Sequence, residues 1–128
     1  MKTLSLTQPW ASLVVSGAKR YETRSWRTNY RGPLAIHAAV SMPPAAVAAA
    51  LRFGLEPGSL PRGAVLGEVV LADCQPAGEV RVGDQERAYG DYSVGRYAWR
   101  LSTPKAYKRP RPARGSLGLW NWDKSEGV

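Results

Sequence analysis

The chain has 128 residues, of which 44% are hydrophobic and 22% are charged. This composition fits one globular domain over residues 1–128 and excludes a collagen-like repeat or a wholly disordered chain. No apolar run is long enough to cross a membrane and no export signal is recognisable, so we expect a cytoplasmic protein. A single cysteine and a single histidine exclude an intramolecular disulfide and a standard Cys/His zinc site, and no metal or cofactor is expected.

Positive charge is concentrated at the two ends of the sequence. The formal net charge is +8, with +5 on residues 1–31, −3 on residues 32–91 and +6 on residues 92–128. If folding brings the two ends together, they form one positive face suited to a phosphate-rich partner such as nucleic acid. The alternative is a basic surface that only keeps a small protein in solution.

Short strands and two helices are expected in the first half of the chain. Alternation with period two favours strands, and the change to a helical period after Leu6 favours a helix that Gly17 ends. An alanine-rich stretch introduced by two prolines favours a second helix that stops at Gly54. The expected strands are residues 2–6, 21–24 and 32–38, and the expected helices are residues 9–16 and 41–51.

The second half is expected to be mostly strand. Residues 64–74 are nearly continuous in apolar side chains and predict a central strand, whereas the polar, glycine-containing residues 76–95 are left unassigned. Residues 97–102 and 117–122 are further strands, and the proline-containing residues 103–115 are expected to be an exposed extended connection. Five to six strands with two short helices predict an α/β (α+β) fold built on a small, mixed, barrel-like sheet.

Basic and aromatic side chains alternate in the acid-free stretch between Asp91 and Asp123. Basic groups neutralise phosphates and flat rings stack on unpaired bases, a combination suited to single-stranded or loop RNA. We expect Lys108, Arg109 and Arg111 to contact phosphates. The alternative is that the basic residues are a solvated loop and that at least half of the aromatic residues are core. These aromatic residues are Tyr97, Trp99, Tyr107, Trp120 and Trp122.

A short motif follows the first expected helix. The segment SGAKRYETRSW holds Gly17, Lys19, Glu22 and Arg24 in the spacing G-x-K-x-x-E-x-R. This motif, together with the order and spacing of the expected strands along essentially the whole chain, resembles the ASCH domain, a family of the PUA-like β-barrel superfamily. The resemblance implies a closed barrel with a cleft under the first helix. It also implies a role in RNA metabolism, through binding of RNA or action on an RNA-derived substrate.

The residues of the motif also make physical sense as a site for RNA or a nucleotide-derived ligand. Gly17 turns the chain sharply and is expected to put Lys19 at the mouth of a cleft, on a phosphate or carbonyl oxygen. Glu22 and Arg24 share one face of an extended segment and can form an ion pair. In the ligand hypothesis Arg24 is a planar fork for phosphate and Glu22 orients the ligand or accepts a proton. The alternative is a pair that only stabilises the turn.

Residues near the motif are further candidate ligand contacts. Trp10, on the first helix, either packs in the core or stacks on a base. Trp26 is expected to be partly exposed, in a polar segment with Arg27 and Arg31. His37 is expected to be an imidazole at the edge of the core, bonded to a backbone carbonyl, with a place in the cleft as the alternative.

An enzymatic function is the second hypothesis. Some relatives in the superfamily hydrolyse acylated cytosine nucleosides with a lysine and a threonine three residues later, but here that position is Glu22 and Thr23 is out of register. Lys19 and Glu22, with Glu68 as a third member, can still activate water. Lys19, Tyr21 and Glu22 can likewise supply the acid, base and charge for metal-independent RNA cleavage. The sequence therefore leaves an RNA-binding domain and a small hydrolase open, and it predicts no oligomeric state.

Overall fold

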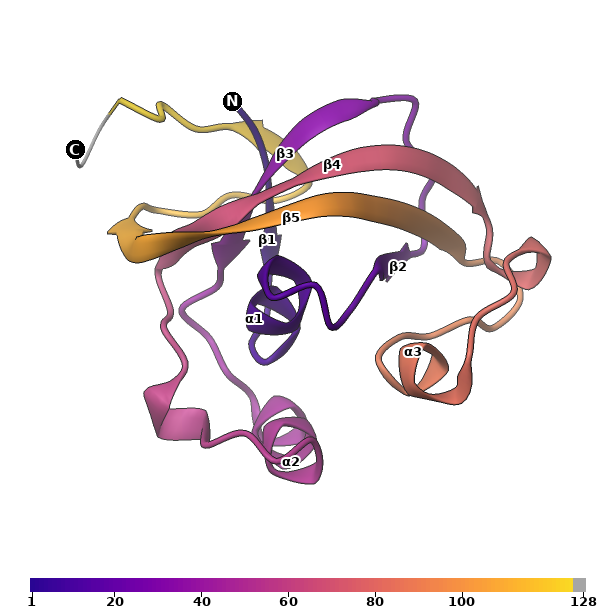
Figure 1. Ribbon diagram of the computed structural model, residues 1–128, viewed down its shortest axis with the longest axis horizontal. Helices are drawn as coiled ribbons and strands as arrows, with labels where there is room; N and C mark the ends of the chain where they lie inside the picture. Colours follow the sequence, from indigo (N-terminus) through magenta and orange to yellow (C-terminus); the bar gives the residue numbers. More distant parts are fainter. Residues whose placement is uncertain (126–128) are drawn as a thin grey trace.

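The computed structural model describes residues 1–125, which fold around one curled six-stranded sheet (Figure 1). The helices of this part are α1 (Trp10–Val15), α2 (Pro44–Arg52) and α3 (Asp84–Ala88), with short 3₁₀ turns at Pro57–Ser59 and Ala77–Glu79. The fold is of the mixed α+β class expected from the sequence. None of these helices is both long enough and apolar enough to cross a bilayer. The strands are β1 (Lys2–Leu6), β2 (Tyr21–Arg24), β3 (Gly32–Ala38), β4 (Ala64–Pro76), β5 (Tyr97–Pro112) and β6 (Leu119–Asn121).

The strand order is β2-β5-β4-β3-β1-β6, with β1 parallel to β3 and the other neighbours antiparallel. β4 lies in the middle of the sheet, as its apolar sequence predicts, because both of its faces and both of its edges are covered. β4 and β5 are the longest strands and curve together over the helices (Figure 1). Within residues 1–125 no ladder joins β6 to β2, so the sheet is a half-barrel rather than the closed barrel that the resemblance implied.

The expected strands at residues 2–6, 21–24 and 32–38 are confirmed with the same bounds. Residues 103–112 are extended and mostly exposed, as expected, but the prediction that they form a connection is wrong, because β5 continues to Pro112 and pairs with β4. β2 pairs only with residues 97–100, so the second half of β5 has one free edge. Its prolines are tolerated there because an edge strand leaves half of its backbone N–H groups without a ladder partner.

The main core lies between the sheet and α1. Helix α1 buries Ala11 and Val14 against β3, β4 and β5, and it ends where Gly17 takes a φ of +86°, a left-handed conformation that favours glycine. Large apolar side chains from four strands pack into this core with at most 1% exposure, and this density of burial holds α1 and the following turn in place. They are Leu4, Leu34, Ile36, Leu71 and Trp99.

The aromatic residues near the C-terminus are packed rather than displayed, which confirms the core alternative for at least half of them. Trp99 and Trp122 are buried; Tyr97, Tyr107 and Trp120 pack against core clusters. His37 is also buried, with Nε2 2.8 Å from the Ala113 carbonyl and Nδ1 3.0 Å from Ser5 Oγ. The expectation of a satisfied imidazole at the edge of the core is therefore confirmed.

The two basic ends of the chain come together. β1 pairs with β6, and the amino group of Met1 donates a hydrogen bond to the Trp122 carbonyl over 2.7 Å. β2 pairs with β5, which joins the motif to the acid-free stretch. Strand pairing therefore joins residues of the first basic segment to residues of the last one at both ends of the sheet.

Candidate ligand-binding site

Lys19 is buried beneath the turn that follows α1. Its backbone N–H donates to the Leu13 carbonyl over 2.9 Å, which closes the turn at Gly17. The side chain is 1% exposed, its Nζ donates to the Tyr89 carbonyl over 2.9 Å, and Nζ lies 3.8 Å from Glu22 Oε1. The expectation that Lys19 stands at the mouth of a cleft is wrong, because the turn directs the side chain inward, where a carbonyl and a carboxylate replace water.

Glu22 lies between two cationic side chains. Besides Lys19 on its inner side, Arg24 Nε lies 3.0 Å from Glu22 Oε2, so the expected ion pair is present. Arg24 also donates from Nη2 to the Ser5 carbonyl over 3.1 Å, which ties β2 to the end of β1. Burial lowers the pKa of the Lys19 ammonium by removing its hydration, and the negative charge of Glu22 opposes that shift.

Glu22 and Arg24 line a small cavity of about 340 Å³ beside α1. Trp10 and Trp26 line it as well, and both are partly exposed, so the structure brings four of the predicted site residues together. The Trp26 ring packs edge-on against Trp99 at 4.8 Å between centroids. The Trp10 ring packs similarly against Phe53, at the C-terminal end of α2. These contacts fix both indoles, because edge-to-face packing restricts ring rotation.

Arg96 is the second arginine of this cavity, and sequence reasoning missed it. Its Nη2 donates to the Thr23 carbonyl over 3.0 Å, and its Nε lies 3.7 Å from Asp91 Oδ2. The Nε atoms of Arg24 and Arg96 are both buried, and neither has a hydrogen-bond partner in residues 1–125; the close Arg24–Glu22 pair lacks hydrogen-bond geometry. Buried donors of this kind are costly unless a ligand or water oxygen accepts from them.

The segment at residues 76–95, which the sequence left unassigned, holds the second 3₁₀ turn and α3 and packs across the free edge of β2. Glu86 accepts hydrogen bonds from the backbone N–H groups of Arg20 (2.9 Å) and Tyr21 (3.2 Å). Thr23 Oγ1 accepts from the Asp91 backbone N–H over 2.9 Å. No local pattern predicts these partners, because they are separated by more than sixty residues along the chain.

The other predicted contacts lie outside the small cavity. Arg27 is exposed, whereas Arg31 donates to two backbone carbonyls of its own loop and lies 3.6 Å from Asp73. Four basic residues lie along the second half of β5, and we call them the basic strip. They are Lys105, Lys108, Arg109 and Arg111.

The basic strip is irregular and partly held in place. The ladder between β4 and β5 shifts register between Val65 and Gly67, which leaves Lys108 and Arg109 exposed in a bulge. Arg111 is partly buried, with its guanidinium 4.6 Å from the centroid of the Tyr107 ring. Lys108 and Arg109 are therefore available to a partner, whereas Arg111 also stabilises the strand.

Glu68, the third member considered for water activation, does not line the small cavity. It accepts a hydrogen bond from the Tyr107 hydroxyl and pairs with Lys124. The side chains of Lys19 and Glu22 therefore lack this third carboxylate as a neighbour. Among residues 1–125, no three His, Cys, Asp or Glu side chains come together as a metal-binding group.

Comparison with known proteins agrees with the motif and the fold. A family model described as the ASCH domain matches residues 4–111. The chain belongs to the ASCH family. This ASCH domain is 31% identical over 129 residues to activating signal cointegrator 1 of Homo sapiens and, equally, to that of Mus musculus. The alignments cover 94% of this chain and 22% of each relative, so the chain spans less than a quarter of their length.

Solved structures share the fold of this ASCH domain. The crystal structure of ASCH from Zymomonas mobilis superposes with a TM-score of 0.60 at 16% sequence identity, covering 96% of this chain and 87% of that chain. A point mutant of the same protein gives the same TM-score and identity and is covered over 90% of its length. At this identity the likeness establishes the fold alone. The ASCH resemblance of the motif is confirmed by the family model.

Proposed function

We propose that this ASCH domain binds single-stranded RNA or a nucleotide-derived ligand, with one base in the cavity lined by Glu22, Arg24 and Arg96. The observation that carries the proposal is that the Arg24 and Arg96 side chains and the Glu22 carboxylate meet in one cavity that two tryptophans also line. Guanidinium groups donate to phosphate and base-carbonyl oxygens, a carboxylate accepts from base amino groups, and indole faces stack on bases.

The size of the cavity supports an unpaired base. About 340 Å³ lies at the small end of pockets that hold ligands, which suits one base and is too small for a base pair. In a duplex the bases are stacked and paired, so their edges and faces cannot enter such a cavity without opening the helix. Single strands and loops are therefore the expected ligands.

Lys19 acts in this proposal as a positioning residue. Its buried ammonium bonds to the Tyr89 carbonyl and lies against Glu22, so it orients the Glu22 carboxylate from behind while Glu22 meets the ligand. Exposed Arg27 and two exposed members of the basic strip, Lys108 and Arg109, add phosphate contacts outside the cavity.

The test measures binding and turnover in the same samples. Affinity for a mixed-sequence single-stranded RNA and for its duplex is measured by fluorescence anisotropy, and products are sought by mass spectrometry after incubation with RNA and nucleosides. We expect tighter binding of the single strand and no product. Arg24→Lys keeps the charge but removes the planar fork, and it should weaken binding about tenfold, or ~1.4 kcal/mol.

Arg52→Gln is the matched control, since Arg52 is exposed on α2 and lines neither this cavity nor the basic strip. This variant should bind like the wild type. Equal affinity for single strand and duplex would contradict a base in the cavity. Release of a product would replace the binding function with the hydrolase hypothesis.

A further inference from the structure

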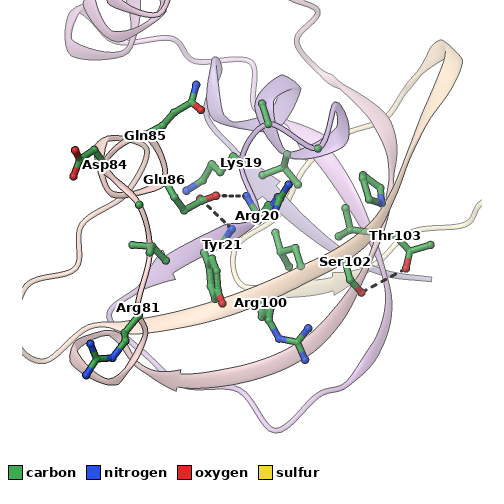
Figure 2. Close-up of a pocket in the computed structure, with 18 residues that line it drawn as sticks. Lys19, Arg20, Tyr21, Arg81, Asp84, Gln85, Glu86, Arg100, Ser102 and Thr103 are labelled. Atoms are coloured by element: carbon green, nitrogen blue, oxygen red, sulfur yellow. Dashed lines mark hydrogen bonds between the residues drawn. The ribbon is translucent and has the colours of Figure 1, made fainter.

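A second, larger cavity lies where the end of α1, the start of β2, the residues around α3 and the middle of β5 meet (Figure 2). Its volume is about 970 Å³, at the upper end of pockets that hold small molecules and cofactors. Lys19 borders this cavity from its buried side, whereas Glu22 and Arg24 line the smaller one. The two cavities therefore lie along the same strand and the turn before it.

Three exposed arginines from different parts of the chain line the larger cavity. Arg20 precedes β2, Arg81 lies between the second 3₁₀ turn and α3, and Arg100 belongs to β5; all three are labelled in Figure 2. In residues 1–125 none of them lies within 4.0 Å of a carboxylate oxygen. Their charge is therefore available to an anion.

Two carboxylates also line the cavity, and one of them is already engaged. Glu86 accepts from the backbone N–H groups of Arg20 and Tyr21 at 2.9 and 3.2 Å, drawn as dashed lines in Figure 2. Asp84 is exposed at the start of α3. With three arginines against two carboxylates, the lining keeps an excess of positive charge that favours a negatively charged ligand.

β5 has a strained residue where it borders this cavity. Thr103 has a φ of +52°, and it is the one non-glycine residue with positive φ in the described part of the chain. The ladder with β4 shifts register between Glu68 and Val70, next to this residue. Thr103 and Ser102 bring hydroxyl groups to the lining, beside the apolar Leu101. Strained residues of this kind concentrate at ligand sites, where the surrounding structure enforces them.

We infer that the larger cavity holds a phosphate-bearing nucleotide. In this arrangement the arginines bind its phosphate, the Ser102 and Thr103 hydroxyls bond to its sugar, and the apolar side chains of the lining lie beneath the nucleotide. The inference rests on the proposed function in one respect: the nucleotide belongs to the same RNA strand whose neighbouring base occupies the smaller cavity. Arginine forks match phosphate oxygens, and hydroxyls bond to ribose. A strand that fills both cavities binds more tightly than a nucleoside, which can fill only the smaller one.

The first experiment separates the two cavities by charge. The double variant Arg81→Gln/Arg100→Gln should bind a mixed-sequence RNA oligonucleotide about tenfold more weakly than the wild type does. Its log–log salt slope should be shallower by about 1.4, since each lost phosphate contact on a single strand removes about 0.7. Affinity for free nucleosides, read from tryptophan fluorescence of the smaller cavity, should not change. The control Arg52→Gln should match the wild type.

Unchanged oligonucleotide affinity and salt slope in the double variant, beside a loss in Arg24→Lys, would overturn this inference and leave the proposed function standing. Failure of the wild type to bind the oligonucleotide at all would overturn both.

The second experiment reports on the cavity directly. Native Cys74 is buried, so Ser102→Cys introduces an accessible thiol into the larger cavity. The RNA oligonucleotide should slow alkylation of this thiol, and free nucleosides should not. Ser59→Cys, at an exposed position in the first 3₁₀ turn, is the control and should alkylate equally with and without RNA. Equal alkylation of Ser102→Cys with and without bound oligonucleotide would overturn the inference.

Discussion

At the scale of single residues, the motif works as a chain of contacts from the inside of the molecule outward. Lys19 is bonded to a carbonyl 70 residues away and to Glu22, Glu22 pairs with Arg24, and Arg24 bonds to the end of β1. Glu22 and Arg24 also line the small cavity, whereas Lys19 lies behind them. In the proposed function the motif therefore serves both stability and ligand binding, and these two roles are assigned to different residues.

Lys19→Met tests the structural role of the lysine. The variant keeps the aliphatic stem but leaves the Tyr89 carbonyl without its donor and removes one cation from Glu22. We expect the free energy of unfolding to fall by about 1–3 kcal/mol, the cost of a buried group left unsatisfied. Urea unfolding measures it, with the exposed Lys108→Met as a control that should match the wild type. Unchanged stability of Lys19→Met would contradict the buried role.

The pKa of Lys19 gives a pH dependence of definite sign. Burial lowers this pKa below the ordinary 10.5, so the unfolded chain binds the proton more tightly than the folded one. Between the lowered pKa and 10.5, the contribution of Lys19 to the free energy of unfolding therefore rises with pH. The difference in unfolding free energy between wild type and Lys19→Met should increase as pH rises through this range. A difference that stays constant or decreases would contradict the lowered pKa.

At the scale of elements, β5 links the parts of the proposed ligand surface. Its first half pairs with β2 and β4, its middle borders the larger cavity, and its second half carries the basic strip. The strand can bend between these parts because its ladder with β4 shifts register at three places. The packing of β4 against β5 therefore decides where the basic side chains point.

Gly67→Ala tests this packing. A Cβ at Gly67 would clash with the backbone carbonyl of Lys105 and the Cα of Ala106 in β5, and backbone atoms cannot move aside cheaply. We expect a loss of about 1–3 kcal/mol in unfolding free energy, as for an overpacked core. Gly78→Ala is the matched control, because nothing lies within 4 Å of the position that the added methyl group would take, and the change should be near neutral. Equal stabilities of the two variants by urea unfolding would show that the strands have room to separate.

The basic strip gives a prediction of its own. Lys108→Ala/Arg109→Ala removes two exposed charges from the bulge of β5 and leaves Arg111 on the Tyr107 ring. RNA binding should weaken for all sequences alike, with the salt slope shallower by about 1.4 and the melting temperature unchanged. Anisotropy titrations at several salt concentrations measure the affinity and the slope, and a thermal melt measures the melting temperature. Binding that equals that of the wild type would show that the strip is only a solvated edge.

At the scale of the whole molecule, the pairing of β1 with β6 and of β2 with β5 joins the two basic ends of the chain. The two arginine-lined cavities and the basic strip all lie on these strands or next to them. Long-range attraction of a polyanion depends on the summed charge of such segments rather than on any single residue. In the proposed function, charges that are distant in the sequence therefore act together in binding.

Salt dependence of the wild type tests the joint action of these charges. Roughly six phosphate contacts to a single strand predict a log–log slope of the binding constant against salt near −4. A poly-anion without bases should bind more weakly than RNA at equal charge, because it cannot fill the base cavity. A slope near zero would contradict the phosphate contacts of the proposed function. Equal affinity for the two polymers would contradict the binding of a base.

The sequence by itself determined most elements, the ASCH family and the residues of the motif. Alternation, apolar runs, proline and glycine act through neighbours in the chain, so the bounds of β1, β2 and β3 follow from local pattern. The ion pair between Glu22 and Arg24 was likewise predictable, because residues two apart in a strand share a face.

Only the tertiary structure decided which of these residues face a ligand. Lys19 is buried because the segment with Tyr89 folds over it, and Arg96 enters the small cavity because β5 pairs with β2. The residues after Ser102 are strand because β4 offers them a partner, although their prolines favour a connection. Contacts between distant parts of the chain supply the free energy in each case, and local sequence patterns do not encode which distant partner a residue will meet.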